Sequence, residues 1–143
     1  MAPEVIVGKG FTHASDIYSV AMLMWEISSG QPPFVNREHD CNLAIDIING
    51  MRPKIVSEIP LEYKSLMKQC WDSNPLKRPD IITLRNKIRE IKTYYQYKPN
   101  ELPQLKTKID EETSYTSSKL FTSKIHKFGN LSEPRNATEC TIV

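Results

Sequence analysis

The sequence predicts an all-α fold for residues 15–92, and two observations support this prediction. Apolar residues recur at the spacing of a helix face in four successive segments, near 15–29, 40–50, 60–72 and 79–95. Glycine or proline follows each of the first three segments, and both residue types end helices. We therefore expect four main helices, with each boundary good to about three residues.

The first segment is expected to be the central helix. Thr12, Ser15 and Asp16 offer side-chain oxygens that can cap its start. The run 17–27 that follows is apolar on nearly every side, and a helix of this kind belongs in the middle of a structure. Gly30 can take the left-handed conformation typical of a helix C-terminus, so the helix is expected to end there.

Each of the other three segments has a narrower apolar stripe, as expected of a helix that buries one face. The stripe of the last segment is the most regular, with spacings of three, four and three residues. The three stripes are Leu43, Ala44, Ile47 and Ile48; Leu66, Met67, Cys70 and Trp71; and Ile81, Leu84, Ile88 and Ile91.

The composition divides the chain of 143 residues into two parts. Residues 1–92 contain most of the Leu, Ile, Val and Met residues and both Trp residues. Residues 93–143 are mainly Lys, Thr, Ser, Glu, Asn and Pro, and such a segment buries too little apolar surface to fold alone. We expect one compact unit over 1–92, followed by a disordered tail over 93–143.

Charge and cysteine content exclude several classes of partner. The 19 basic and 17 acidic residues leave a net charge of +2, which predicts neither a nucleic-acid partner nor a membrane partner. No apolar run is long enough to cross a membrane. The three cysteines lie far apart, and no histidine is at ligand spacing, so we expect no metal site. This cysteine pattern predicts a reduced, intracellular and most simply cytoplasmic chain.

Several short motifs occur in a characteristic order. They are Ala2-Pro3-Glu4, Ser15-Asp16-Ile17-Tyr18-Ser19, Trp25-Glu26-Ile27, Gly30-Gln31-Pro32-Pro33-Phe34 and the run from Cys70-Trp71 through Asn74-Pro75 to Arg78-Pro79. Taken together, they resemble the second half of the C-terminal lobe of a protein kinase, closest to the tyrosine-kinase and tyrosine-kinase-like groups. Tyr18 and Ala21 replace the more usual tryptophan and glycine, but both substitutions keep size class and helix propensity.

The resemblance implies a structural ion pair between Glu4 and Arg78. In kinases these positions tie the end of the activation segment to the helical core. Arginine suits this role because its planar guanidinium can hold a carboxylate with two hydrogen bonds. The alternative is two solvated charges 74 positions apart.

The resemblance also assigns roles to four residues of the central helix. Asp16 matches the acid that accepts hydrogen bonds from the catalytic loop of kinases, and Leu23 and Ile27 match the anchors of an apolar column that reaches ATP. Glu26 matches an acid that faces the substrate peptide in some kinases. The alternatives are an Asp16 that interacts only with its own helix, Leu23 and Ile27 as ordinary apolar residues of a central helix, and a solvated Glu26.

The motifs that carry out kinase chemistry all precede Ala-Pro-Glu, so this sequence contains no catalytic, cofactor-binding or metal-binding residue. ATP and Mg²⁺ are implied only for a parent domain, which would transfer the γ-phosphoryl group to Ser, Thr or Tyr hydroxyls of proteins in signalling. The chain as given is therefore expected to be inactive. One alternative is a non-catalytic kinase remnant that docks a protein partner through the surface around Leu43 to Ile48, and another is an unrelated helical adaptor.

If half of the lobe is absent, the central helix has too few neighbours to cover it. We therefore expect Leu23, Met24 and Ile27 to be exposed to solvent. Each such side chain left in water forfeits about 1.5–3 kcal/mol of burial. The chain is accordingly expected to be marginally stable and to self-associate through this apolar surface.

Overall fold

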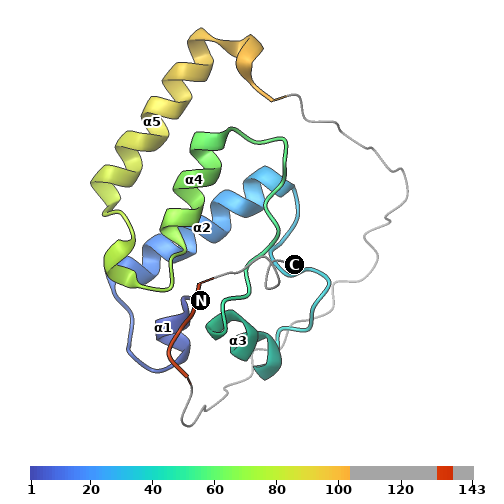
Figure 1. The fold of residues 1–143 in the computed structure, drawn as a ribbon, viewed down its shortest axis with the longest axis vertical. Coiled ribbons are helices and arrows are strands. Elements are labelled where there is room, and N and C mark those ends of the chain that lie inside the picture. Colours follow the sequence, from blue (N-terminus) through green and yellow to red (C-terminus); the bar gives the residue numbers. More distant parts are fainter. Residues whose placement is uncertain (104–131, 137–143) are drawn as a thin grey trace.

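The computed structural model describes residues 1–103 and 132–136, and it is built from helices (Figure 1). The helices are α1 (Pro3–Ile6), α2 (His13–Ser29), α3 (Cys41–Ile48), α4 (Leu61–Cys70) and α5 (Ile81–Tyr97), with short 3-10 turns η1 (Pro75–Lys77) and η2 (Pro99–Glu101). These described residues contain no β-strand. The predicted all-α fold is confirmed, and α2 to α5 each lie within two residues of their predicted boundaries.

The sequence patterns did not predict α1, η1 or η2. Helix α1 has four residues and each 3-10 turn has three, so none contains enough residues to show an apolar period. Helix α5 runs across the change in composition at residue 93 and ends at Tyr97. Most of the expected tail lies outside the described residues, so its division from the compact unit stays a prediction.

Helix α2 has a well-defined start and end. The Thr12 side chain accepts a hydrogen bond from the Ser15 backbone N–H, and the Ser15 hydroxyl accepts one from the Thr12 N–H, which together form a capping box. Gly30 ends the helix in the left-handed region with φ 72°, as predicted. Asp16, the third candidate cap, is exposed and takes no part in this cap.

One face of α2 is buried and the other is open to solvent. The buried face packs against α4, which lies beside α2 in Figure 1. Its members recur at helical spacing: Ile17, Tyr18, Ala21, Met24 and Trp25. Leu23 and Ile27 lie on the other face and are 56% and 80% exposed. The expectation of exposure is met for these two, but it is wrong for Met24, which is 4% exposed because it shares the face of Ala21 and Trp25.

The later helices bury narrower stripes. Leu66, Met67 and Cys70 of α4 join the core, and burial raises the pKa of the Cys70 thiol to about 11, so this cysteine is an inert core residue. In α5 only Leu84 is fully buried, whereas Ile81 of the predicted stripe is 61% exposed. The stripe of α5 is therefore covered less than its regular spacing predicted.

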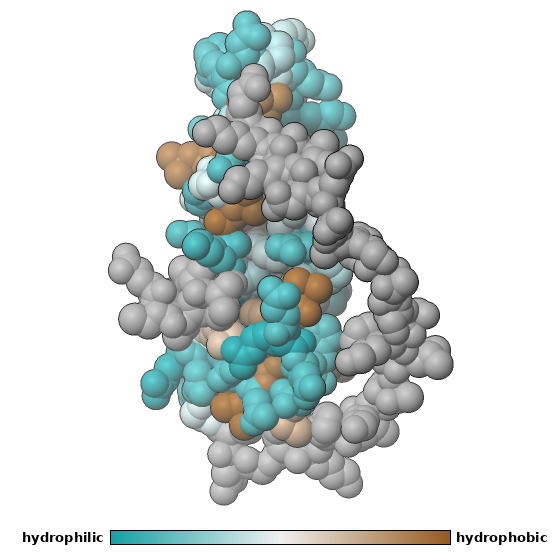
Figure 2. All heavy atoms as spheres, turned by 90° about the vertical axis from the view of Figure 1, so that its right-hand side faces the viewer, coloured by the Kyte–Doolittle hydropathy of each residue, from teal (hydrophilic) through white to brown (hydrophobic). Residues whose placement is uncertain are grey.

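The described residues contain no helix that could cross a membrane. Figure 2 shows one face of the molecule, on which apolar residues form separate patches among hydrophilic ones.

Candidate functional site

The structure brings Glu4 and Arg78 together in a buried ion pair with two hydrogen bonds. The two guanidinium Nη atoms of Arg78 donate to the two carboxylate oxygens of Glu4 over 2.6 and 2.8 Å. The Arg78 side chain is fully buried and that of Glu4 is 6% exposed. Two parallel hydrogen bonds hold the carboxylate in one plane with the guanidinium, the strongest arrangement that such a pair can adopt.

Arg78 also joins parts of the backbone that are distant in sequence. Its Nε donates to the Asp72 carbonyl, and its Nη1 donates to the Ala14 carbonyl, both over 2.8 Å. A single side chain thus connects α1, the first turn of α2 and the turn that follows α4. Burial by itself raises the pKa of Glu4, but the hydrogen bonds from Arg78 and the nearby positive charges outweigh it, so this pKa lies below its usual value.

A second buried arginine lies on the other side of Tyr18. The guanidinium carbons of Arg52 and Arg78 are each 5.1 Å from the centre of the Tyr18 ring, within the range of a cation–π contact. Arg52 is 1% exposed, and its guanidinium donates to the carbonyls of Ile47, Met51 and Trp71. Desolvation lowers the pKa of Arg52, and the three carbonyls compensate for the buried charge.

Tyr18 is a buried polar residue whose hydroxyl has no hydrogen-bond partner among the described residues. Burial raises its pKa to about 12, so the hydroxyl stays protonated. We define the arginine cluster as Glu4, Tyr18, Arg52 and Arg78. Chemically it is a structural unit, because Glu4 compensates the charge of Arg78, backbone carbonyls compensate that of Arg52, and all four side chains are buried.

Sequence reasoning found only part of this cluster. Glu4 and Arg78 were expected to pair, and Tyr18 was noted only as a replacement for tryptophan. Arg52 was missed because it lies between helices, where no apolar period or charge spacing marks a residue as buried.

The other predicted site residues lie apart from the arginine cluster, on the open side of α2. Asp16, Leu23, Glu26 and Ile27 are all exposed. Among the described residues the structure gives the side chains of Asp16 and Glu26 no hydrogen bond. The roles that the family resemblance assigns to these four positions therefore remain predictions.

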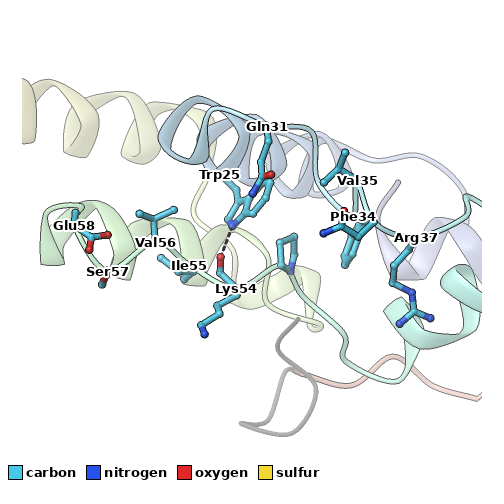
Figure 3. A pocket seen from close by; sticks show the side chains of 12 residues that line it. Trp25, Gln31, Phe34, Val35, Arg37, Lys54, Ile55, Val56, Ser57 and Glu58 are labelled. Atoms are coloured by element: carbon cyan, nitrogen blue, oxygen red, sulfur yellow. Dashed lines mark hydrogen bonds between the residues drawn. The ribbon is translucent and has the colours of Figure 1, made fainter. Parts of the chain in front are cut away.

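Two open grooves flank the end of α2. One, of about 390 Å³, is lined by Trp25, Phe34 and residues of the segment after α3, and Figure 3 shows Trp25 donating from its indole N–H to the Lys54 carbonyl over 2.8 Å. The other, of about 720 Å³, lies between α1, α2 and α3 and also includes Phe34. No group of three or more potential metal ligands occurs within residues 1–103 and 132–136.

Comparison with known proteins identifies the family. Residues 1–88 match the protein tyrosine and serine/threonine kinase family, so the chain belongs to that family. It is 40% identical over 83 residues to a putative serine/threonine-protein kinase/receptor of Acanthamoeba polyphaga mimivirus, a match that covers 56% of this chain and 5% of the viral protein.

Two relatives from Dictyostelium discoideum agree with this assignment. The dual specificity protein kinase zakA is 38% identical over 98 residues, covering 66% of this chain and 12% of zakA. A probable serine/threonine-protein kinase is 35% identical over 91 residues, covering 64% of this chain and 6% of that protein. The chain therefore spans between 5% and 12% of the length of these relatives.

Proposed function

We propose that residues 1–92 are the C-terminal part of the C-lobe of a protein kinase domain of the tyrosine-kinase-like type. The buried pair of Glu4 and Arg78 is the observation that carries this proposal, because it joins Ala-Pro-Glu to Arg-Pro as the kinase resemblance implies. The forms Cys70-Trp71 and Asn74-Pro75 support the tyrosine-kinase-like type.

The open face of α2 supports a fragment over a module with its own core. Leu23 and Ile27 are apolar side chains on the central helix, yet they face solvent in the part of the chain that the structure describes. In the proposed parent domain the missing half of the lobe covers this face. A module with its own core would bury Leu23 and Ile27 as well. In this chain only Met24 of these three apolar residues is buried.

The parent domain would transfer the γ-phosphoryl group of ATP, with Mg²⁺, to a protein hydroxyl. That chemistry depends on a phosphate-covering loop, a strand lysine, metal-binding Asp and Asn residues and a catalytic Asp. None of these motifs occurs in this sequence. The chain alone therefore contributes a scaffold and possesses neither the nucleotide site nor the catalytic loop. We propose a cytoplasmic location, supported by the three cysteines, which lie far apart in the sequence and form no Cys-x-x-Cys pair.

Calorimetry of the chain with Mg²⁺-ATP tests the missing nucleotide site. The expected result is no measurable heat of binding and no phosphotransfer to a generic protein substrate. Micromolar affinity would contradict the proposal if a substitution within 1–92 abolished it, because the nucleotide site would then lie in this chain.

The transcript that encodes the chain tests the parent assignment. The expected result is a reading frame that continues upstream of Met1 and encodes His-Arg-Asp and then Asp-Phe-Gly. A start codon at Met1 preceded by neither motif would contradict the proposal that the chain belongs to a catalytic parent.

A further inference from the structure

Residues 132–136 return to the helical unit and lie against it, although they follow α5 by more than thirty positions. Figure 1 shows this segment near the ends of α1 and α3. The Arg135 backbone N–H donates to the Ile48 carbonyl over 2.7 Å, at the last residue of α3. The Ile48 carbonyl is one of the last carbonyls of α3, which have no partner within the helix, so the Arg135 N–H supplies the hydrogen bond that it lacks.

The Asn136 side chain makes two hydrogen bonds with the turn after α4. Its Oδ1 accepts from the Ser73 backbone N–H over 2.5 Å, and its Nδ2 donates to the Asp72 carboxylate over 3.3 Å. An amide is suited to this position because it offers an acceptor and a donor on one planar group. A carboxylate in its place would meet the charge of Asp72, and a hydroxyl has only one atom to serve both bonds.

Gly50 provides the room for this contact. A Cβ atom at Gly50 would lie 2.3 Å from the Asn136 carbonyl oxygen and 2.8 Å from its carbonyl carbon. Gly50 also has φ +103°, a backbone conformation that side chains with a Cβ rarely adopt. The close approach of the segment to the helical unit therefore requires glycine at this position.

Two arginines of the arginine cluster bind the backbone next to the residues that contact the segment. Arg52 donates to the carbonyls of Ile47 and Trp71, which are adjacent to Ile48 and Asp72 in the chain. Arg78 donates to the carbonyl of Asp72 itself. The two backbone stretches that contact the segment are therefore positioned by buried guanidinium groups.

A fourth contact, the ion pair between Lys9 and Glu133 at 2.8 Å, adds little to binding. Its side chains are 55% and 81% exposed, and exposed pairs of this kind contribute little and are screened by salt. Recognition therefore depends on the Asn136 amide, the Arg135 backbone and the room at Gly50.

We propose that Ile48, Gly50, Asp72 and Ser73 form a docking site for a peptide segment with an asparagine, and that the chain's own residues 132–136 occupy it. The contact is intramolecular. The docking site selects the asparagine by the pairing of its amide with the Ser73 N–H and the Asp72 carboxylate. No feature of this docking site depends on kinase chemistry, so the proposal stands independently of the function proposed above.

Amide hydrogen exchange of the full chain, measured by NMR at Ser73 and Arg135, tests the docking. Asn136→Ala removes both side-chain hydrogen bonds of Asn136. The exchange rates of the Ser73 and Arg135 amides are therefore expected to rise at least about tenfold, since the loss of a single hydrogen bond already has an effect of this size. The matched control is Asn100→Ala, since Asn100 is an exposed asparagine of η2. It should leave both rates unchanged. Unchanged exchange in Asn136→Ala, or the same rise in the control, would overturn the proposal.

A reciprocal exchange of side chains tests the pairing itself. Asn136→Asp places two carboxylates in contact and should undock the segment, with the same rise in exchange. Adding Asp72→Asn places an amide donor at position 72 opposite the carboxylate acceptor at position 136. The double variant should therefore recover protection from exchange to within about twofold of the parent chain. A double variant as unprotected as Asn136→Asp would show that the pairing does not determine docking.

Dilution distinguishes an intramolecular contact from one between two copies. If the segment binds its own chain, the exchange rates at Ser73 and Arg135 stay constant when the protein is diluted. Loss of protection on dilution would show that the docking site binds the segment of a second copy, and it would overturn the intramolecular proposal.

Discussion

At the scale of single residues, Arg78 has more structural partners than any sequence pattern indicated. It is fully buried, pairs with Glu4 and donates to the Asp72 and Ala14 carbonyls. Truncation would leave the Glu4 charge buried without a partner and would also release both carbonyls. The free energy of unfolding depends on this side chain more than on an exposed arginine elsewhere in the chain.

We predict that Arg78→Ala lowers the free energy of unfolding by about 3–5 kcal/mol. This is the usual effect of removing one partner of a buried ion pair while the charge of the other partner stays buried. Urea unfolding followed by circular dichroism measures the change. Arg85→Ala is the matched control, because Arg85 is exposed on α5, and it should stay within about 0.5 kcal/mol of the parent. An Arg78→Ala chain as stable as the control would contradict the structural role of the pair.

We also predict an acid-dependent loss of stability through Glu4. Its pKa is lowered in the folded chain from an ordinary value of 4.5, so the folded state favours the carboxylate. The stabilisation is therefore present above pH 4.5 and is lost as the pH falls below that value toward the folded pKa. Unfolding measured across this range should show a smaller dependence on pH in Glu4→Gln than in the parent. Identical slopes for the two proteins would contradict the assignment.

At the scale of elements, α2 has two faces that the sequence alone did not separate. Nearly every residue from 17 to 27 is apolar, so the hydrophobic pattern alone did not show which side is buried, and Met24 was expected to be exposed together with Leu23 and Ile27. The structure buries the face that meets α4 and leaves Leu23 and Ile27 in solvent. Adjacent residues of one helix, Leu23 and Met24, consequently lie in opposite environments.

We predict that Met24→Ala and Leu23→Ala differ strongly in their effect on stability. Met24 is 4% exposed, and its truncation should leave a core cavity that costs about 2–5 kcal/mol in the free energy of unfolding. Leu23 is 56% exposed, and its truncation should cost less than about 1 kcal/mol. Urea unfolding of the two variants measures the difference. Equal losses would show that the two faces of α2 are covered alike.

At the scale of the whole molecule, uncovered apolar surface should make the chain associate. Leu23 and Ile27 are one turn apart on α2, so their exposed side chains are neighbours. A few uncovered apolar side chains are comparable in free energy with the whole stability of a small domain, about 5–15 kcal/mol. Burial of this strip against a second copy would recover part of the loss.

We predict that the double variant Leu23→Ser and Ile27→Ser reduces self-association, measured by sedimentation velocity over a range of protein concentrations. Leu76→Ser is the control, because Leu76 is 93% exposed but belongs to η1 and is not part of the Leu23 and Ile27 strip on α2. It should leave association unchanged. A parent chain that remains monomeric and unfolds in one sharp transition would contradict this prediction.

Local sequence determined helices α2 to α5. Their boundaries follow from apolar periods, from the Thr12 cap and from Gly30, and each of these acts within a few residues of the chain. The ion pair of Glu4 with Arg78 was also accessible from the sequence, but only because each residue stands in a motif that resembles the kinase pattern.

Tertiary structure alone decided which faces are covered and which distant groups meet. Arg52 is buried because carbonyls from α3 and from the end of α4 converge on it, and no local pattern indicates such convergence. The docking of Asn136 beside Gly50 likewise depends on residues more than eighty positions apart. Helix formation depends on neighbours in the sequence, whereas burial depends on which other elements pack against a surface, and therefore only the folded chain determines it.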